Sequence, residues 1–262
     1  MSHLCSTLKH DTFHKTKKRL GQNFLISSAI LEELTKLIPL NSKIIEIGGG
    51  TGVITEKLLE KSQDVSVVEV DKSLANFLSQ KFDGKINVLN MDFLKMKKFD
   101  YEVIVSAVPY YISKLFLLKL YDFTPTWKLA VLILQKEFVD KLLAKPGADN
   151  YRQISVLSQY AWQIQKIKDV PRESFYPRPK VDSVIIKLIP KSPFDKVEAS
   201  KLKKVINVLF SYRNKTLKST IKIIKDTNFK RLEDSLNNIL LHKRIKELEV
   251  ADFVEILHHL SI

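Results

Sequence analysis

The sequence of 262 residues contains a single cysteine, Cys5. Disulfide frameworks and cysteine zinc sites need several cysteines, so both are excluded, and a reducing compartment is expected. No window approaches the ~18 consecutive apolar residues that a membrane-spanning helix requires. An apolar segment after Met1 is also missing, so we expect no secretory signal. General disorder is excluded because 45% of the residues are hydrophobic and 9% are aromatic.

Acidic residues are few relative to basic ones: Asp and Glu number 29 against 43 Lys and Arg, a formal net charge of +14. A protein this basic typically binds a polyanion, above all nucleic acid. The alternative is a lysine-rich surface that reflects an AT-rich genome or growth at high temperature. We interpret residues 1–20 as a basic arm, with Lys17, Lys18 and Arg19 as candidates for contacts to RNA phosphates.

Hydrophobic periodicity alternates between strand and helix over the first part of the chain. It predicts strands at 43–48, 64–71, 86–93 and 101–108, and helices at 27–38, 51–61, 72–82 and 111–121, while 128–144 opens as a strand and continues as a helix. Strands that alternate with helices at this spacing predict βαβ units and a parallel sheet. The fold class is therefore α/β, with a doubly wound Rossmann-like sheet.

The later part of the chain is organised differently. A strand, a proline-rich loop and another strand are predicted within 163–189, and from Glu198 onward only helical periodicity is found. These patterns predict an arm (1–20), an α/β domain (21–192) and a small all-helical domain (193–262). Basic residues gather in the helical part before Asp226, and those expected to bind RNA phosphates are Lys201, Lys204, Arg213, Lys215 and Lys218.

A glycine-rich segment, Glu46–Gly52 (EIGGGTG), lies between the first strand and its helix. Glycines there let the backbone turn sharply and approach a nucleotide cofactor closely. A dinucleotide site requires G-x-G-x-x-G, but position 53 is Val, so the third glycine falls one residue early. The spacing suits S-adenosylmethionine, which has no pyrophosphate to bind at the helix N-terminus. A glycine-rich turn without any ligand is the alternative.

Two acidic residues follow the next strands. Glu69 ends the second strand, 21 residues after Gly48, and an acid at that place accepts hydrogen bonds from ribose hydroxyls. A free carboxylate there would also oppose the 2′-phosphate of NADP. Asp92 follows the third strand and is placed to accept a hydrogen bond from an adenine amino group.

The segment Ser106–Ser113 (SAVPYYIS) follows the fourth strand, at the sheet edge where ligands dock in open α/β folds. Pro109 stiffens the turn, and Tyr110 offers a flat face on which a base can stack. Ala107, Val108, Pro109 and Tyr110 are therefore candidates for the reaction site.

These motifs, in this order, resemble those of the ribosomal RNA adenine N6,N6-dimethyltransferases. The resemblance runs from about Lys17 to the C-terminus and is carried by Lys18–Leu25 (KRLGQNFL), Glu46–Gly52, Glu69–Asp71, Met91–Leu94, Val108–Ser113, Glu173–Val184 (ESFYPRPKVDSV) and Leu209–Leu217 (LFSYRNKTL). Many methyltransferases share the glycine loop, whereas the QNFL and FYPRPKVDS segments are much more specific. The enzymes that methylate large-subunit rRNA and confer erythromycin resistance share the fold, but Leu209–Leu217 suits the small-subunit group better.

The resemblance implies a class I methyltransferase domain that transfers two methyl groups from S-adenosylmethionine to each of two adjacent adenosines near the 3′ end of small-subunit rRNA. It further implies a pre-ribosomal small subunit as partner, a monomer, no metal and a cytoplasmic enzyme, with nucleolus and mitochondrion as alternatives. The cofactor site would comprise Gln22, Asn23, Leu25, Gly48, Gly50, Glu69, Asp92 and Ala107. Tyr110 and Phe175 would sandwich the target adenine.

One position departs from the family pattern, which reads Asn-Leu-Pro-Tyr where this chain has Ala107-Val108-Pro109-Tyr110. The Asn oxygen and the next backbone carbonyl would accept the two N–H bonds of the adenine amino group and stabilise the charge that develops on transfer. Loss of one such partner costs about 2–4 kcal/mol, a factor of roughly 10² to 10³ in rate. Ala107 is an engineered inactivating substitution, or another acceptor such as Ser106 replaces Asn, or the chain binds RNA without chemistry.

Two further functions stay open at this point. A ribosome-assembly or transcription factor on the same fold would bind nucleic acid without methylating it, which Ala107 favours. A dehydrogenase on a Rossmann fold is opposed by the early third glycine and by the net charge of +14.

Overall fold

The computed structural model describes residues 21–224 and 227–260. The predicted basic arm, with Lys17, Lys18 and Arg19, lies outside these residues. The chain forms two compact units. One runs to Val139 and includes Ile164–Pro190, and the other consists of Asp140–Gln163 and the chain from Lys191. Within the described ranges, no helix is long and apolar enough to cross a membrane.

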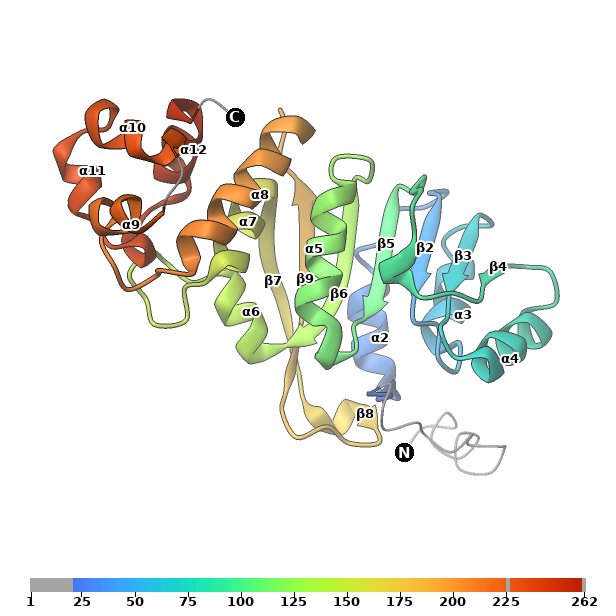
Figure 1. Ribbon diagram of the computed structural model, residues 1–262. Coiled ribbons are helices and arrows are strands. Elements are labelled where there is room, and N and C mark those ends of the chain that lie inside the picture. Colours follow the sequence, from blue (N-terminus) through green and yellow to red (C-terminus); the bar gives the residue numbers. More distant parts are fainter. Residues whose placement is uncertain (1–20, 225–226, 261–262) are drawn as a thin grey trace. The chain divides into compact units, whose positions relative to one another are not determined.

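A seven-stranded sheet with the order β4-β3-β2-β5-β6-β9-β7 forms the centre of the first unit. Its strands are β2 (Ile44–Ile47), β3 (Val65–Val68), β4 (Asn87–Leu89), β5 (Val103–Ala107), β6 (Leu129–Gln135), β7 (Trp162–Val170) and β9 (Ser183–Pro190). Figure 1 shows them side by side from β4 through β3, β2, β5 and β6 to β9. The strand order reverses between β2 and β5, and ligands of open α/β sheets bind at such a switch point.

The first five strands of this order pair in parallel, as predicted, whereas β9 runs antiparallel to β6. The periodicity of an apolar run indicates a buried strand but carries no information on its direction, so the sheet is mixed rather than wholly parallel. All residues of β2 and β3 are buried, which is typical of parallel strands covered by helices on both faces. The helices of this unit are α2 (Ser28–Thr35), α3 (Val53–Leu59), α4 (Lys72–Phe82), α5 (Ser113–Phe123) and the start of α6 (Lys136–Leu142).

Helix α4 shows how local signals set these elements. Asp71 caps its N-terminus by accepting a hydrogen bond from the Ser73 amide, and Asp83 ends it in the left-handed conformation. Leu74, Leu78 and Phe82 are buried at helical spacing, so one face packs on the core while the other meets solvent. The capping residues and the spacing of the apolar residues indicate the same ends for this helix, so the predicted range 72–82 is confirmed.

The second unit is helical. Its helices are α7 (Gln153–Ala161), α8 (Lys196–Phe210), α9 (Leu217–Ile223), α10 (Thr227–Ser235), α11 (Asn238–His242) and α12 (Val250–His259). Helices α7 and α12 pack on α8, and the buried Tyr151 donates a hydrogen bond to the Leu248 carbonyl over 2.9 Å. Residues 140–163, predicted as part of the α/β domain, belong to this unit instead. The reason is contact with residues almost a hundred positions away, such as that of Tyr151 with Leu248.

The glycine loop packs against the sheet through Gly49. A Cβ atom at this position would lie 2.4 Å from Val67 Cγ1 and 2.8 Å from Leu78 Cδ1. We therefore expect Gly49→Ala to lower the free energy of unfolding by about 1–3 kcal/mol through overpacking, measured by urea denaturation. In a Val67→Ala background the same substitution should cost less, because the clashing methyl is gone. Equal costs in the two backgrounds would contradict this packing.

Candidate active site

A cavity of about 380 Å³ opens at the carboxyl ends of β2, β3, β5 and β6. Its lining is mostly apolar, with a few polar groups, as in small-molecule sites generally. It brings together every residue predicted for the cofactor or the target base: Gln22, Asn23, Leu25, Gly48, Gly50, Glu69, Asp92, Ala107, Val108, Pro109, Tyr110 and Phe175. One site therefore joins segments that are far apart in the sequence.

The glycine loop presents one side to this cavity. Gly48 has a φ of 84°, and a Cβ added there would meet nothing within 4 Å. Gly50 also has a positive φ, and its amide donates a hydrogen bond to Glu69 Oε2 over 3.0 Å. With Gly49 packed on the sheet behind it, the loop is held from one side and leaves open space for a ligand at Gly48.

Glu69 differs from the free carboxylate that was predicted. It is 5% exposed, and Oε1 accepts a hydrogen bond from the Asp71 amide over 2.9 Å while Oε2 accepts one from Gly50. Each oxygen keeps acceptor capacity for a further hydroxyl. Burial is the main cause that raises the pKa of this carboxyl. Glu69 therefore joins the end of β3 to the glycine loop in addition to facing the cavity.

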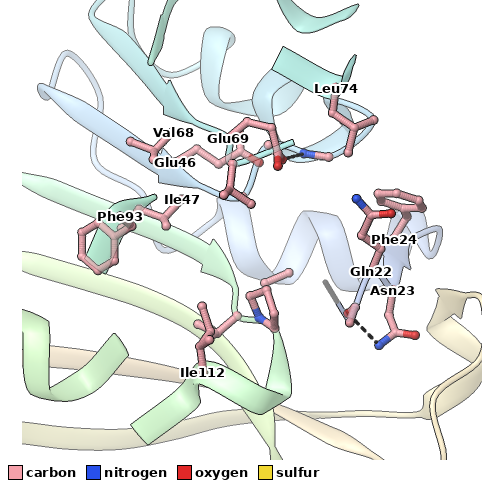
Figure 2. Close-up of a pocket in the computed structure, with 18 of the residues that line it drawn as sticks. Gln22, Asn23, Phe24, Glu46, Ile47, Val68, Glu69, Leu74, Phe93 and Ile112 are labelled. Atoms are coloured by element: carbon pink, nitrogen blue, oxygen red, sulfur yellow. Dashed lines mark hydrogen bonds between the residues drawn. The ribbon is translucent and has the colours of Figure 1, made fainter. Parts of the chain in front are cut away.

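Glu46 is a site residue that the sequence analysis did not assign. Its side chain is 1% exposed and lines the cavity, and Figure 2 shows it beside Glu69. Oε2 accepts a hydrogen bond from Thr55 over 2.5 Å, whereas Oε1 has no hydrogen-bond partner among the described residues. Burial, with a smaller contribution from Glu69, raises its pKa to about 8. The sequence does contain a signal for Glu46: it is an acid within the apolar run IIEI of a buried strand. A buried acid needs either a hydrogen-bond partner or a proton, which marks it as a candidate site residue.

Asp92 is only partly buried and accepts a hydrogen bond from the Leu94 amide over 2.9 Å, so it caps the short 3₁₀ helix Phe93–Lys95. Gln22 and Asn23 lie across the cavity from Phe93 (Figure 2). Gln22 donates to Asp71 Oδ2 over 3.2 Å, and Asn23 donates to the Gly21 carbonyl over 3.3 Å. Gln22 and Glu69 thus both bond to Asp71, at the start of α4.

A two-stranded sheet, β1 (Phe24–Leu25) with β8 (Phe175–Tyr176), brings the two most specific motifs together. Leu25 pairs with Phe175 in antiparallel register, and both side chains are buried. Strands of two residues have no periodicity, so the sequence could not predict this pairing. It places Phe175, 4% exposed, in the wall of the cavity.

The segment after β5 forms another wall. Ala107 pairs with Ile133 of β6, and the Val108 amide donates to the Ile133 carbonyl over 3.1 Å. Pro109 precedes the 3₁₀ helix Tyr110–Ile112, and the half-buried Tyr110 hydroxyl lies 2.6 Å from Ser183 Oγ. Backbone contacts to a buried strand thus set the position of this loop.

The structure excludes Ser106 as a substitute acceptor for the missing Asn. Ser106 is 0% exposed and does not line the cavity. Its Oγ donates a hydrogen bond to the Ile47 carbonyl over 2.6 Å, which commits it to the neighbouring strand. Because side chains alternate along a strand, Ser106 and Ala107 point to opposite faces, and the expectation that Ser106 could serve is corrected.

The predicted RNA-binding residues of the second unit differ among themselves. Lys204 and Lys215 are exposed, Lys201 is partly buried, and Lys218 Nζ lies 3.8 Å from Glu233. Arg213 donates to the carbonyls of Asp149 and Tyr151 over 3.2 and 3.5 Å. Arg213 therefore holds the segment before α7 in place, a structural contact that the charge pattern did not predict. No group of three His, Cys, Asp or Glu that could hold a metal occurs in the described ranges.

The fold and the site define a class I methyltransferase. A solved dimethyladenosine transferase from Plasmodium falciparum superposes with a TM-score of 0.77 at 26% identity, covering 89% of this chain and 95% of that one. The 23S rRNA methyltransferase ErmE shares the fold, with a TM-score of 0.66 at 21% identity over 92% of this chain and 100% of its own.

Sequence comparison is more specific. The family described as ribosomal RNA adenine dimethylase matches residues 13–261. Ribosomal RNA small subunit methyltransferase A of Mycoplasma mobile is 37% identical, covering 81% of this chain and 85% of the relative. The protein of the same description from Legionella pneumophila strain Corby is 34% identical over 95% of this chain and 99% of its own. The chain belongs to the ribosomal RNA adenine dimethylase family, which confirms the predicted family, fold class and enzyme class.

Glu46 leads to a pH prediction. A buried acid whose pKa is about 8 in the folded protein, against 4.5 ordinarily, binds its proton more tightly when folded. Its contribution to stability is therefore present at low pH and is lost as pH rises from about 5 to 8, by about 1 kcal/mol per unit. Glu46→Gln, which keeps the shape without a titrating proton, should flatten the pH dependence of the free energy of unfolding. Parallel curves for parent and variant would contradict this reading.

Proposed function

We propose that this chain transfers methyl groups from S-adenosylmethionine to N6 of two adjacent adenosines near the 3′ end of small-subunit rRNA, twice at each. The observation that carries the proposal is one cavity in which Gly48, Glu69 and Asp92 adjoin Tyr110 and Phe175. The substrate would be a pre-ribosomal small subunit, and the enzyme would act as a cytoplasmic monomer.

The residues of the cavity fit this cofactor. A volume of about 380 Å³ is within the range of sites for molecules of this size. The open side of Gly48 admits the ligand, and Glu69 keeps acceptor capacity for hydroxyl groups. The third glycine of the loop, Gly52, falls one residue too early for the dinucleotide spacing. This opposes the dehydrogenase alternative.

When bound, S-adenosylmethionine supplies a methyl group activated by its sulfonium charge. The chain's own contribution is to hold the adenine and to orient its amino group. Tyr110 and Phe175 provide the aromatic faces of the cavity, and base–aromatic stacking contributes roughly 1–3 kcal/mol for each base. The Val108 carbonyl is the backbone acceptor proposed for one N–H bond. Ala107 has no side-chain acceptor for the second N–H bond of the amino group, so we expect transfer to be slower than with Asn at this position.

Ala107 also supports a second candidate function, that of an rRNA-binding factor without catalytic activity. With Ala107 in place and Ser106 bonded to Ile47, the chain lacks the acceptor pair on which catalysis depends. An rRNA-binding assembly factor without chemistry would need only the RNA contacts and the fold.

Transfer of labelled methyl groups to small ribosomal subunits that lack the modification tests the function. We expect Ala107→Asn to raise the rate by roughly 10² to 10³, because the restored amide oxygen accepts the second N–H bond. Ala107→Leu is the matched control, with similar volume and no acceptor, and should give no gain. Mass spectrometry resolves N6-methyladenosine from N6,N6-dimethyladenosine. No product from the parent or from Ala107→Asn would favour the assembly factor.

The exposed lysines of the second unit support an RNA contact. We expect the Lys204→Ala, Lys215→Ala double variant to weaken rRNA binding and to reduce the log–log salt slope by about 2, since each phosphate contact contributes about one unit. Thermal stability should stay unchanged because both side chains are exposed. The double variant Lys85→Ala, Lys97→Ala, at two exposed positions of the first unit, is the control of equal charge change. An unchanged slope in the double variant would remove these lysines from the interface.

A further inference from the structure

A hydrogen bond connects the proposed base-stacking residue with the buried start of β9. Tyr110 Oη and Ser183 Oγ lie 2.6 Å apart, at the short end of the O–H···O range. Ser183 is 0% exposed and is the first residue of β9, where it pairs with Gln135 of β6. The sheet therefore determines where the Ser183 hydroxyl lies.

The backbone around Tyr110 restrains its ring less firmly. Tyr110 begins a 3₁₀ helix of three residues whose N-terminal residue, Pro109, provides no side-chain cap. Hydrogen bonds from Val108 to Ile133 and from Ile112 to Pro109 hold the backbone, but neither involves the Tyr110 side chain. A rotation of the ring away from its place would break the bond to Ser183. This bond consequently selects the ring orientation.

The segment that contains Ser183 is itself held on both sides. The Asp182 carbonyl accepts a hydrogen bond from the Lys136 amide over 3.1 Å, and Asp182 Oδ1 accepts one from the Arg172 amide over 3.0 Å. The loop 171–182 also carries Phe175, the second aromatic residue of the cavity wall. The positions of both aromatic residues, Tyr110 and Phe175, therefore depend on the segment 182–183 at the start of β9.

We propose that Ser183 is a positioning residue for methyl transfer, holding the Tyr110 hydroxyl so that the ring meets the target adenine at the correct angle. The inference rests on the proposed function, because it takes Tyr110 as the stacking surface. Burial raises the pKa of Tyr110, so the phenol stays protonated at working pH and the neutral hydroxyl pair persists.

A double-mutant cycle tests the proposal in the Ala107→Asn background, which has the faster chemistry. Ser183→Ala and Tyr110→Phe should each lower kcat about tenfold and leave the dissociation constant for S-adenosylmethionine within about twofold. The double variant should match the single ones, because both substitutions remove the same bond. Ser183→Thr keeps a hydroxyl and should recover activity. Losses that multiply, or a fall in thermal stability alone, would overturn the assignment.

A second measurement does not depend on chemistry. A short rRNA fragment with 2-aminopurine at the target adenosine reports stacking on Tyr110 as fluorescence quenching. We expect weaker quenching with Ser183→Ala and Tyr110→Phe at unchanged RNA affinity, even if no methyl group is transferred. This outcome separates the role of Ser183 from the proposed reaction, whereas equal quenching in parent and variants would overturn it.

Ser62→Ala is the matched control. Ser62 is also a buried serine, and its Oγ donates to the Ser42 carbonyl over 2.7 Å, outside the residues that line the cavity. Ser62→Ala removes this bond and the one that the Asp64 amide donates to Ser62 Oγ over 3.1 Å, without touching the aromatic residues. We expect reduced stability with unchanged kcat and quenching. A fall in kcat equal to that of Ser183→Ala would mean that general destabilisation explains both.

Discussion

The buried carboxylate of Glu69 is the group on which the site depends. It accepts hydrogen bonds from the Gly50 and Asp71 amides, so a single side chain joins the glycine loop after β2 to the end of β3. Asp71 in turn caps α4 and accepts a hydrogen bond from Gln22. Cofactor loop, helix and N-terminal segment are thereby held relative to one another by a few charge-assisted bonds, which are the strong ones in proteins.

The two buried carboxyls that line the cavity differ in how they are held. Glu46 and Glu69 are both buried and both have raised pKa values, chiefly because burial penalises their charged forms. Glu46, whose pKa is about 8, keeps its proton at neutral pH, so it presents a neutral acid to the cavity rather than a second charge beside Glu69. Glu69 is instead held by the amides of Gly50 and Asp71.

The wall of the cavity formed by the end of β5 and the loop after it surrounds Ala107. The β5 end, the Val108 amide bond to Ile133 and the Tyr110 bond to Ser183 form a firm frame around position 107. That frame is intact although the Ala107 side chain carries no hydrogen-bond acceptor. The end of β5 and the loop after it are thus fully formed with alanine at position 107.

Local patterns in the sequence were sufficient for the parallel strands, for the range of α4 and for Gly48, Glu69 and Asp92 at the strand ends, because caps, periods and strand ends are properties of neighbouring residues. Gln22, Asn23, Leu25 and Phe175 were expected in the cavity only from the family resemblance, and Glu46 was not assigned. Only the tertiary structure decided the pairing of Leu25 with Phe175, the commitment of Ser106 to Ile47 and the place of Arg213 beside the Asp149 carbonyl. The antiparallel direction of β9 and the transfer of 140–163 to the helical unit were decided in the same way. Each depends on a partner distant in sequence, and local periodicity carries no information about such partners.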